Sequence, residues 1–282
     1  MTIGVVGLGL IGASMAKTIK KHTEFAVMGY DISDEVMQSA LLDETIDAQL
    51  DLENEKCDFL IIALYPDDTV EFVKNNAKYL SDTIVIDCGG TKKKVCNELF
   101  PVAKEYDFTF IGGHPMAGVE KSGYDASTDS MFDGAFMILV PDDDVDRKTL
   151  DYAKMFFISI GFHRITLTDQ TSHDRIIAYT SQLAHVTSSA YIKSPTALKN
   201  LGFSAGSFKD MTRVAFLNEG MWTDLFLQNR DFLLEEIETL EKNLAEYRKA
   251  LENRDREGLY ALLADGKKKR VAAWTAVEKK KK

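Results

Sequence analysis

The sequence is poor in the features that mark secreted, metal-binding and membrane proteins. Its 282 residues include three cysteines (Cys57, Cys88 and Cys96) whose spacing fits no metal site, and their odd number argues against a disulfide framework. The longest apolar runs, such as residues 59–64, are far too short to span a bilayer. The strand-like run at residues 2–6 starts next to Met1, so we expect no signal peptide. We therefore expect a cytoplasmic protein with reduced thiols, no metal ion and no membrane contact.

An excess of positive charge is also missing. The chain carries 34 Lys and Arg against 44 Asp and Glu, a net charge of −10 at pH 7. Nucleic-acid-binding proteins need a basic surface to neutralise phosphates, so this balance disfavours a nucleic-acid partner. Basic residues do gather at 267–270 and 279–282, which we interpret as a solvated helix end in preference to an interaction tail. With 45% apolar residues, the composition is that of a globular protein.

The sequence does contain a dinucleotide-binding pattern at its start. A β-branched run at 2–6 leads into Gly7-Leu8-Gly9-Leu10-Ile11-Gly12, and helical spacing follows at 13–20. The first glycine allows a tight turn, the second lets the backbone approach a pyrophosphate, and the third lets the helix pack on the strand. The N-terminus of that helix offers unpaired N–H groups to the phosphates.

An acidic residue completes this pattern. The predicted strand at 25–30 ends in Asp31, which lies 19 residues after Gly12. A carboxylate at this spacing accepts hydrogen bonds from the ribose hydroxyls and would repel a 2′-phosphate. No arginine follows directly, so we expect NAD rather than NADP.

Strands and helices alternate through residue 167. Further strands are expected at 59–64, 83–87, 108–111, 135–140 and 163–166, and helices at 67–80, 91–100 and 148–158. This alternation predicts an α/β fold with a doubly wound parallel sheet of Rossmann type over residues 1–167. Ligands of such sheets bind at the carboxyl ends of the strands, where Leu64, Gly90 and His114 fall.

One histidine is placed for chemistry at this edge. His114 lies in Gly112-Gly113-His114-Pro115-Met116-Ala117-Gly118, between two small-residue turns that follow the strand at 108–111. An imidazole has an ordinary pKa of about 6.5, so it can accept and return protons near neutral pH. The alternative is a buried, hydrogen-bonded histidine in a tight turn. Sheet topology favours the functional interpretation, because it places His114 on the cofactor side.

The remainder, residues 168–282, has no strand pattern and is expected to form a helical domain. On a helix at 169–191, Asp174 and His185 are spaced to share one face, which suggests a lined pocket or an ordinary solvated stripe. Lys209 and Arg213 lie one helical turn apart beside a Gly/Ser-rich bend. Two such cations can bind an anion, with guanidinium forming a fork on a carboxylate, or can be solvated surface charges.

An apolar stripe then runs along a single helix of about 30 residues, from Phe226 to Leu251, with near-heptad spacing. A helix of this length usually buries its stripe against another helix of the same domain or of a second subunit. We therefore predict a homodimer formed through this region.

Five motifs in order give the chain a resemblance to the prephenate and arogenate dehydrogenases of tyrosine biosynthesis over nearly its whole length. They are the glycine motif at 7–12, Asp87-Cys88-Gly89-Gly90-Thr91-Lys92, the His114 segment with 120–123, Ser172-His173-Asp174 with 181–185, and Phe208-Lys209-Asp210-Met211-Thr212-Arg213. The resemblance implies a Rossmann domain followed by a helical substrate and dimerisation domain. It also implies NAD-dependent oxidative decarboxylation of prephenate to 4-hydroxyphenylpyruvate, with arogenate as the alternative substrate.

The same resemblance implies roles for individual residues. His114 would accept the proton of the ring hydroxyl, and Arg213 would hold the ring carboxylate. The other substrate positions would be Lys209, His185, Glu120, Asp174, Trp222 and Val119. The cofactor positions would be Gly7, Leu8, Gly9, Leu10, Ile11, Gly12, Asp31, Leu64 and Gly90.

The chain departs from its relatives where they often carry a serine beside the catalytic histidine. Gly90 stands there, so Thr91 or a water molecule would have to serve. Val119 replaces a threonine found in many relatives near the substrate side chain, which leaves the choice between prephenate and arogenate open. The 115 residues after 167 suffice for a helical domain only, so any inhibition by tyrosine would act at the active site.

Two other functions fit parts of the pattern. A dehydrogenase of the β-hydroxyacid type would use Lys209 as its acid–base group, but it would leave the His114 segment without a role. A non-catalytic NAD-sensing protein would explain the missing serine. It would not explain the histidine, lysine and arginine at matching positions.

Overall fold

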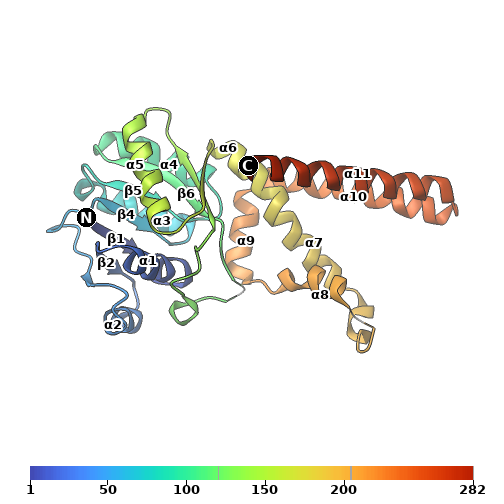
Figure 1. Ribbon diagram of the computed structural model, residues 1–282, viewed down its shortest axis with the longest axis horizontal. Helices are drawn as coiled ribbons and strands as arrows, with labels where there is room; N and C mark the ends of the chain where they lie inside the picture. The colour runs from blue at the N-terminus through green and yellow to red at the C-terminus, as the bar shows by residue number, and fades with distance from the viewer. Residues whose placement is uncertain (120, 204, 282) are drawn as a thin grey trace. The chain divides into compact units, whose positions relative to one another are not determined.

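The computed structural model describes residues 1–119, 121–203 and 205–281, with side chains given through residue 275. Within these residues, eight strands form one sheet in the order β3-β2-β1-β4-β5-β6-β7-β8. The strands are β1 (Thr2–Val6), β2 (Ala26–Tyr30), β3 (Ala48–Gln49), β4 (Phe59–Ile62), β5 (Ile84–Asp87), β6 (Thr109–Pro115), β7 (Phe136–Pro141) and β8 (Arg164–Leu167). The central order follows the doubly wound pattern that the sequence predicts (Figure 1).

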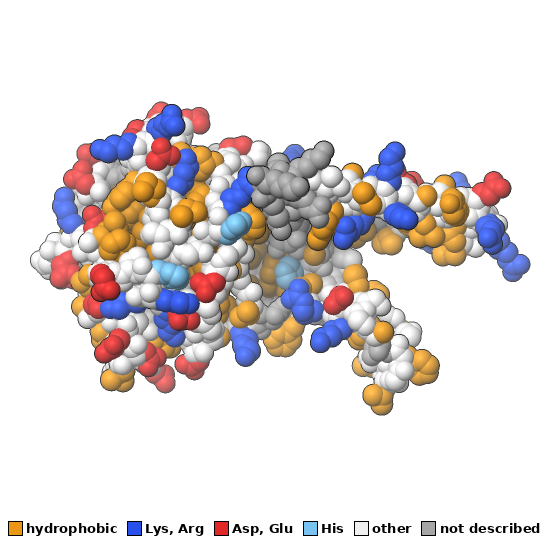
Figure 2. Space-filling view, in the orientation of Figure 1, with side chains coloured by type: hydrophobic (Ala, Val, Ile, Leu, Met, Phe, Trp, Pro, Cys, Tyr) orange, Lys and Arg blue, Asp and Glu red, His pale blue; other side chains and the backbone are white. Residues whose placement is uncertain are grey.

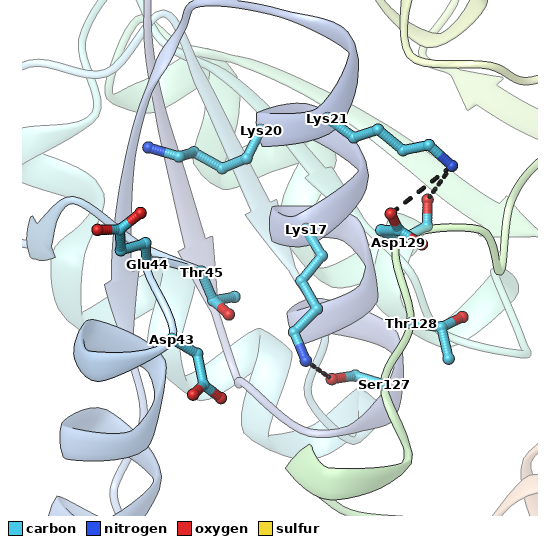
Figure 3. Close-up of a pocket in the computed structure, with 9 residues that line it drawn as sticks. All are labelled: Lys17, Lys20, Lys21, Asp43, Glu44, Thr45, Ser127, Thr128 and Asp129. Carbon is cyan, nitrogen blue, oxygen red and sulfur yellow. Dashed lines mark hydrogen bonds and ion pairs between the residues drawn. The ribbon is translucent and has the colours of Figure 1, made fainter.

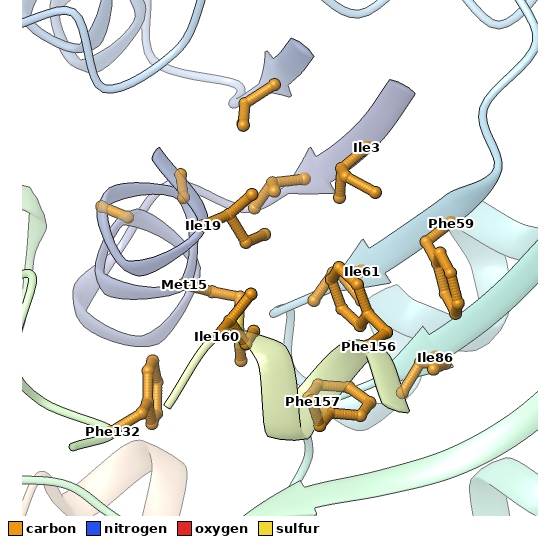
Figure 4. Close-up of a cluster of buried hydrophobic side chains, with 14 of the residues drawn as sticks. Ile3, Met15, Ile19, Phe59, Ile61, Ile86, Phe132, Phe156, Phe157 and Ile160 are labelled. Carbon is orange, nitrogen blue, oxygen red and sulfur yellow. The ribbon is translucent and has the colours of Figure 1, made fainter. Parts of the chain in front are cut away.

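Helices cover both faces of this sheet. They are α1 (Leu10–His22), α2 (Asp34–Leu42), α3 (Pro66–Asn76), α4 (Lys93–Glu105) and α5 (Arg147–Ser159). Along β4, Phe59 and Ile61 join a core with α1 and α5, whereas Leu60 and Ile62 join a second core with α3 and α4. Figure 4 shows the first core, where Phe59 stacks on Phe156 with ring centroids 4.4 Å apart. This alternation is why a strand buried on both faces appears in the sequence as one continuous apolar run.

One strand pair departs from the predicted parallel sheet. β7 runs antiparallel to β6, with His114 opposite Ile138, whereas the other neighbouring strands pair in parallel. A parallel neighbour needs a crossover, usually a helix. In the described part of the connection from β6 to β7, the helical structure is the short 3₁₀ turn η2 (Tyr124–Ala126), so the chain returns antiparallel.

After β8, every described element is helical. These elements are α6 (Gln170–Ile177), a π-helical turn η3 (Ala178–Gln182), α7 (Leu183–Ile192), η4 (Pro195–Lys199), α8 (Gly206–Thr212), η5 (Arg213–Ala215), α9 (Glu219–Gln228), α10 (Arg230–Glu252) and α11 (Arg256–Lys281). The expected domain boundary at 167/168 coincides with the last strand. As a boundary it stays a prediction, because residues 1–230 form one compact unit and residues 231–282 a second.

The long helix predicted from Phe226 to Leu251 is interrupted. α9 ends at Gln228 and α10 begins at Arg230, with Asn229 between them. The Asn229 side chain is buried and donates to Asp174 O and Gln182 Oε1, at 2.8 and 2.7 Å. Apolar periodicity does not reveal such a break, because Asn229 is held by residues that are remote in the sequence.

The second unit consists of α10 and α11, which run side by side in opposite directions (Figure 1). Tyr247 of α10 donates from its hydroxyl to Leu262 O of α11 at 3.4 Å. Large apolar side chains remain exposed on both helices, including Leu251 at 63% and Tyr260 at 76%, and Figure 2 shows hydrophobic side chains along them. The described helices include none that is both long and apolar enough to cross a membrane.

Candidate active site

The glycine motif builds a close junction between β1 and α1. Gly7 has φ +82°, and a Cβ on it would lie 2.6 Å from the carbonyl oxygen of Ala63 and 2.7 Å from Leu64 Cδ2. A Cβ on Gly12 would lie 1.8 Å from the carbonyl oxygen of Gly7. Both positions therefore require glycine for reasons internal to the fold, as the sequence predicts.

Gly9 differs from its two neighbours in the motif. A Cβ built there would meet no protein atom within 4 Å, so the fold itself does not require glycine. Gly9 is the N-cap residue of α1 and has no side chain to cap the helix. The N–H groups of the first turn, including those of Leu10 and Ile11, are thus left to a ligand, and the open side at Gly9 fits a pyrophosphate.

Asp31 lies directly after β2 and is fixed by main-chain contacts. Its Oδ2 accepts from Leu8 N at 2.7 Å and its Oδ1 from Ser33 N at 3.0 Å. Each carboxylate oxygen keeps a second acceptor site, which suits the ribose hydroxyls of NAD. The residues present therefore fit this cofactor at both its pyrophosphate and its ribose.

His114 belongs to a strand and not to a turn. β6 continues to Pro115, four residues beyond the predicted end at 111, so His114 is its penultimate residue. Gly113 makes this possible, because a Cβ there would lie 2.2 Å from Asp87 O. Gly113 thus allows β6 to lie closely against β5, and a Cβ on Gly112 would lie 2.7 Å from Cys96 Sγ of α4. These two glycines belong to the strand and do not form a turn, so His114 stands on β6 at the carboxyl edge of β5.

A chain of hydrogen bonds leads away from His114. Its Nδ1 lies 2.9 Å from His173 Nε2, and the Nδ1 of His173 lies 2.7 Å from Asp174 Oδ1. His173 and Asp174 are both 1% exposed, whereas His114 is partly buried. Sequence reasoning assigned His114 and Asp174 roles in the site but gave none to His173, which joins them.

Asp174 also organises the start of α4. Its Oδ1 accepts from Lys92 N at 2.8 Å and its Oδ2 from Lys93 N at 2.9 Å. A carboxylate from α6 thereby caps a helix that has no side-chain cap of its own. Asn229 donates to the main-chain oxygen of Asp174 and so holds this residue from the other side.

The π-helical turn η3 separates Asp174 from His185. It adds a residue to one turn, so the α-helical spacing expected to place these two side chains on one face does not hold. Asp174 bonds to the start of α4, whereas His185 Nδ1 donates to Val214 O at 2.9 Å. Asp174 and His185 therefore make contacts in two separate places.

A buried ion pair lies next to His114. Lys92 Nζ contacts Asp87 Oδ2, with side chains 0% and 1% exposed. Asp87 also accepts from Gly89 N at 2.9 Å and from Gly113 N at 3.0 Å, so it links the end of β5 to the residue before His114. Sequence reasoning gave no role to Asp87 or Lys92, although they are the first and last residues of the motif at 87–92, one of the five that carry the family resemblance.

This environment keeps both histidines neutral. Burial is the main cause that lowers the pKa of His114 well below 6.5, and the nearby His173 and Lys92 lower it further. Burial also lowers the pKa of His173, although the hydrogen bond to Asp174 opposes that shift. A neutral His114 has an unprotonated ring nitrogen and can act as a base at neutral pH.

Two further predicted residues, His185 of α7 and Trp222 of α9, lie in contact. The rings of His185 and Trp222 have centroids 3.9 Å apart, and Trp222 lines a cavity of about 360 Å³ together with Glu219 and Phe226. α9 joins this group to the His114 side, because Gln228 accepts from Thr91 Oγ1 at 2.7 Å. Trp222 and Gln228 are six positions apart on this helix, or about 9 Å along the axis.

The structure places the remaining predicted residues as follows. Thr91 donates to Gln228, and no hydrogen bond between Thr91 and His114 occurs among the described residues. Lys209 and Arg213 lie one turn apart, as predicted, since Arg213 N donates to Lys209 O, and both side chains are exposed. Val119 is 52% exposed. Glu120 lies outside the described residues.

A larger hollow of about 670 Å³ lies away from these residues, beside α1 (Figure 3). Three lysines line it, and each has a partner. Lys17 donates to Ser127 Oγ at 2.8 Å, Lys20 pairs with Asp47, and Lys21 lies 3.7 Å from Asp129 and 3.3 Å from Asp133. We assign no role to this hollow, because its charges are balanced and it contains none of the predicted site residues.

The fold and site together define an NAD-dependent dehydrogenase with a helical C-terminal region. The profile of the prephenate dehydrogenase nucleotide-binding domain matches residues 15–180, and that of the prephenate dehydrogenase dimerization domain matches residues 169–265. The chain belongs to the prephenate dehydrogenase family.

Individual relatives agree with this assignment. A prephenate dehydrogenase of Lactococcus lactis subsp. cremoris is 34% identical over 95% of this chain and 76% of its own length. A crystal structure of Aquifex aeolicus prephenate dehydrogenase with hydroxyphenyl propionate and NAD+ is 28% identical, with a TM-score of 0.82 over 97% of this chain and 98% of that one. A Synechocystis arogenate dehydrogenase is 25% identical, with a TM-score of 0.81 over 97% and 100% of the two chains.

Proposed function

We propose that His114 is the base in the NAD-dependent oxidative decarboxylation of prephenate to 4-hydroxyphenylpyruvate. The observation that carries this proposal is a histidine whose pKa is lowered, placed at the carboxyl edge of the sheet and hydrogen-bonded from behind through Nδ1. When bound, NAD+ supplies the acceptor for the hydride that leaves the ring carbon bearing the hydroxyl. The residues of the chain handle the proton and hold the substrate.

The proton follows a closed path. His114 takes the hydroxyl proton as the hydride departs, and the C–O bond gains double-bond character. Loss of the ring carboxylate as carbon dioxide returns an electron pair to the ring and makes it aromatic. The resulting phenolate oxygen then recovers a proton from His114, so the histidine ends each turnover neutral. Aromatisation supplies the driving force, and the protein contributes mainly orientation.

The substrate side of the proposal rests on residues of α7, α8, η5 and α9. Arg213 would hold a substrate carboxylate, and Lys209 one turn before it adds a second cation. His185 and Trp222 would form an aromatic wall, which suits a planar ring. Glu120 and Val119 stay proposed substrate residues by family resemblance.

The alternative substrate is arogenate, which carries an amino group where prephenate carries a keto group. Val119 bears on this choice, because it replaces the threonine of many relatives and has no hydrogen-bonding group. A keto side chain needs no acceptor at this position, so we favour prephenate. A role for Lys209 as the acid–base group is less favoured, because it would leave the buried His114–His173–Asp174 chain without a function.

We also propose that the protein is a homodimer through its helical region. The exposed apolar side chains of α10 and α11 support this assembly, as does the match to a dimerization domain. One chain has a mass of 31.6 kDa. Light scattering at micromolar concentration should give twice this mass, and the mass of a single chain would refute the proposal.

A cytoplasmic location and inhibition by tyrosine at the active site complete the proposal. Cys57, Cys88 and Cys96 are free thiols, as expected for a reducing compartment. Burial raises the pKa of Cys57 to about 11 and that of Cys88 to about 12, which keeps these thiols unreactive.

The experiment that tests the reaction follows NADH absorbance after mixing the protein with NAD+ and prephenate. Parallel reactions replace prephenate by arogenate, and NAD+ by NADP+. We expect the highest kcat/KM with prephenate and NAD+. Absence of NADH with either substrate would refute the proposed reaction, whereas a preference for arogenate would correct only the substrate.

A further inference from the structure

The hydrogen bonds behind His114 have only one consistent direction. Asp174 accepts main-chain N–H groups on both of its carboxylate oxygens, so it is the acceptor toward His173 as well. The Nδ1 of His173 must therefore carry a hydrogen. A neutral imidazole has one N–H, so the Nε2 of His173 is the unprotonated nitrogen.

The tautomer of His114 is fixed in the same way. Because His173 Nε2 can only accept, the Nδ1 of His114 must donate to it across the 2.9 Å contact. The Nε2 of neutral His114 is then the nitrogen with an available lone pair. This is the tautomer that can take a proton at Nε2. Asp174 determines it through two hydrogen bonds, one to His173 and one from His173 to His114.

Resting on the proposed function, we propose that His173 and Asp174 are a positioning dyad for His114, which fixes its tautomer and stabilises the imidazolium formed when it accepts the substrate proton. His173 binds Nδ1 of His114, which leaves Nε2 for the reaction. It gives His114 a partner in a chain where glycine stands at position 90 in place of the serine of many relatives.

The surroundings make the dyad rigid. His173 and Asp174 are buried, and Asp174 is tied to the N-terminus of α4 and to Asn229. The charged groups near His114 are then Lys92, which disfavours a proton on the ring, and Asp174, which favours one through His173. Lys92 is itself paired with Asp87, so the negative charge of Asp174 remains to offset the imidazolium.

Variants at His173 separate positioning from mere packing. His173→Gln keeps an oxygen that can accept the Nδ1–H of His114, whereas His173→Leu fills the space without an acceptor. We expect His173→Leu to lower kcat by about 10²-fold with KM changed less than about threefold, and His173→Gln to lose only about tenfold. His163→Gln, at an exposed histidine outside the site, is the matched control and should keep wild-type kinetics.

A merely structural role for His173 would give a different pattern. Both variants would then lose activity in proportion to the decrease in their melting temperature and in their affinity for NAD. The kcat of His173→Gln would be no higher than that of His173→Leu. A kcat for His173→Leu within about twofold of wild type would overturn the dyad, even where His114 itself proves essential.

An NMR measurement tests the dyad without relying on activity or on any variant. Protein labelled with 15N at its five histidines reports which ring nitrogens carry hydrogen. At pH 8 we expect His114 and His173 both to be protonated at Nδ1 and unprotonated at Nε2. A His114 protonated at Nε2 would overturn the inference. The proposed reaction is judged separately, by NADH formation.

In Asp174→Asn, an amide nitrogen in the place of Oδ1 would donate to His173 and reverse both tautomers, with loss of the hydrogen bond from Lys92 N. His114 would then carry its hydrogen on Nε2, and kcat should fall with the appearance of that tautomer. A folded Asp174→Asn variant with reversed tautomers and a wild-type kcat would contradict the inference.

Discussion

The buried pair of Asp87 and Lys92 offers a test in which stability and catalysis respond differently. Asp87→Asn keeps an oxygen for Gly113 N but removes the charge opposite Lys92, which is 0% exposed. The NH2 group of the amide then takes the place of Oδ2 and faces two donors, Lys92 Nζ and Gly89 N. Breaking a buried ion pair by removing one partner costs about 3–5 kcal/mol, because the other charge is left uncompensated.

The two single variants should be unequal. In Lys92→Met, the Asp87 carboxylate still accepts from Gly89 N and Gly113 N, so its charge is partly compensated. In Asp87→Asn, the ammonium of Lys92 loses its acceptor. We therefore expect Asp87→Asn to be the less stable variant, with a melting temperature lower by roughly 6–20 °C at about 2–4 °C per kcal/mol.

Combining the substitutions removes both charges together. Asp87→Asn/Lys92→Met should regain at least about 2 kcal/mol relative to Asp87→Asn, because no buried charge is left unpaired. Denaturant unfolding of the four proteins gives the coupling free energy directly. Near-additive losses, or an Asp87→Asn variant as stable as wild type, would refute the assignment of a tightly coupled buried pair.

Catalysis should respond to Lys92 in its own way. The positive charge of Lys92 is one of the causes that lower the pKa of His114, so Lys92→Met should raise that pKa. The acid limb of kcat/KM would then move to higher pH in Lys92→Met and in the double variant. An acid limb that stays at the wild-type pH in both would show that Lys92 does not act on His114.

Three further predictions concern the substrate, the cofactor and stability. Arg213→Ala should raise KM by about 10²-fold with kcat changed less, whereas Arg147→Ala on the surface of α5 serves as a matched control with unchanged kinetics; an unchanged KM for Arg213→Ala would remove its role. Asp31→Ser should lower the ratio of kcat/KM for NAD over NADP by about tenfold or more, and an unchanged ratio would contradict the ribose contact. The pKa values of His114 and His173 are lowered by folding, so the unfolded chain binds more protons, and stability is present above pH 6.5 and lost as the pH falls below it. Each histidine contributes at most about 1.4 kcal/mol per pH unit, and His173→Gln should flatten this decline in urea titrations between pH 7 and pH 5; an unaltered slope would exclude its contribution.

The nucleotide-binding half could be predicted because its signals are local. The roles of Gly7 and Gly12 follow from contacts within one strand–turn–helix unit, and that unit forms as expected. The antiparallel β7 was missed because its direction depends on whether the connection before it contains a helix, which apolar periodicity in the strand does not encode.

The candidate site was predicted in part for the same reason. His114 could be singled out from its own segment, but its partner His173 lies 59 residues away and is brought to it by the packing of α6 against α4. Asp174 was noticed as a polar residue on a helix, yet its contacts depend on where α4 begins, and the π turn η3 alters its relation to His185. Sequence spacing alone does not contain these tertiary contacts.

The most direct test of the central claim, that neutral His114 accepts the substrate proton, is the pH profile of kcat/KM for wild type and His114→Asn with prephenate and NAD+. We expect a wild-type plateau at neutral pH with an acid limb below 6.5, since the pKa of His114 is lowered from that value. His114→Asn should bind NAD normally, lose about 10²–10⁴-fold in kcat and lack the acid limb. Wild-type turnover by His114→Asn, or an unchanged acid limb in that variant, would contradict the claim.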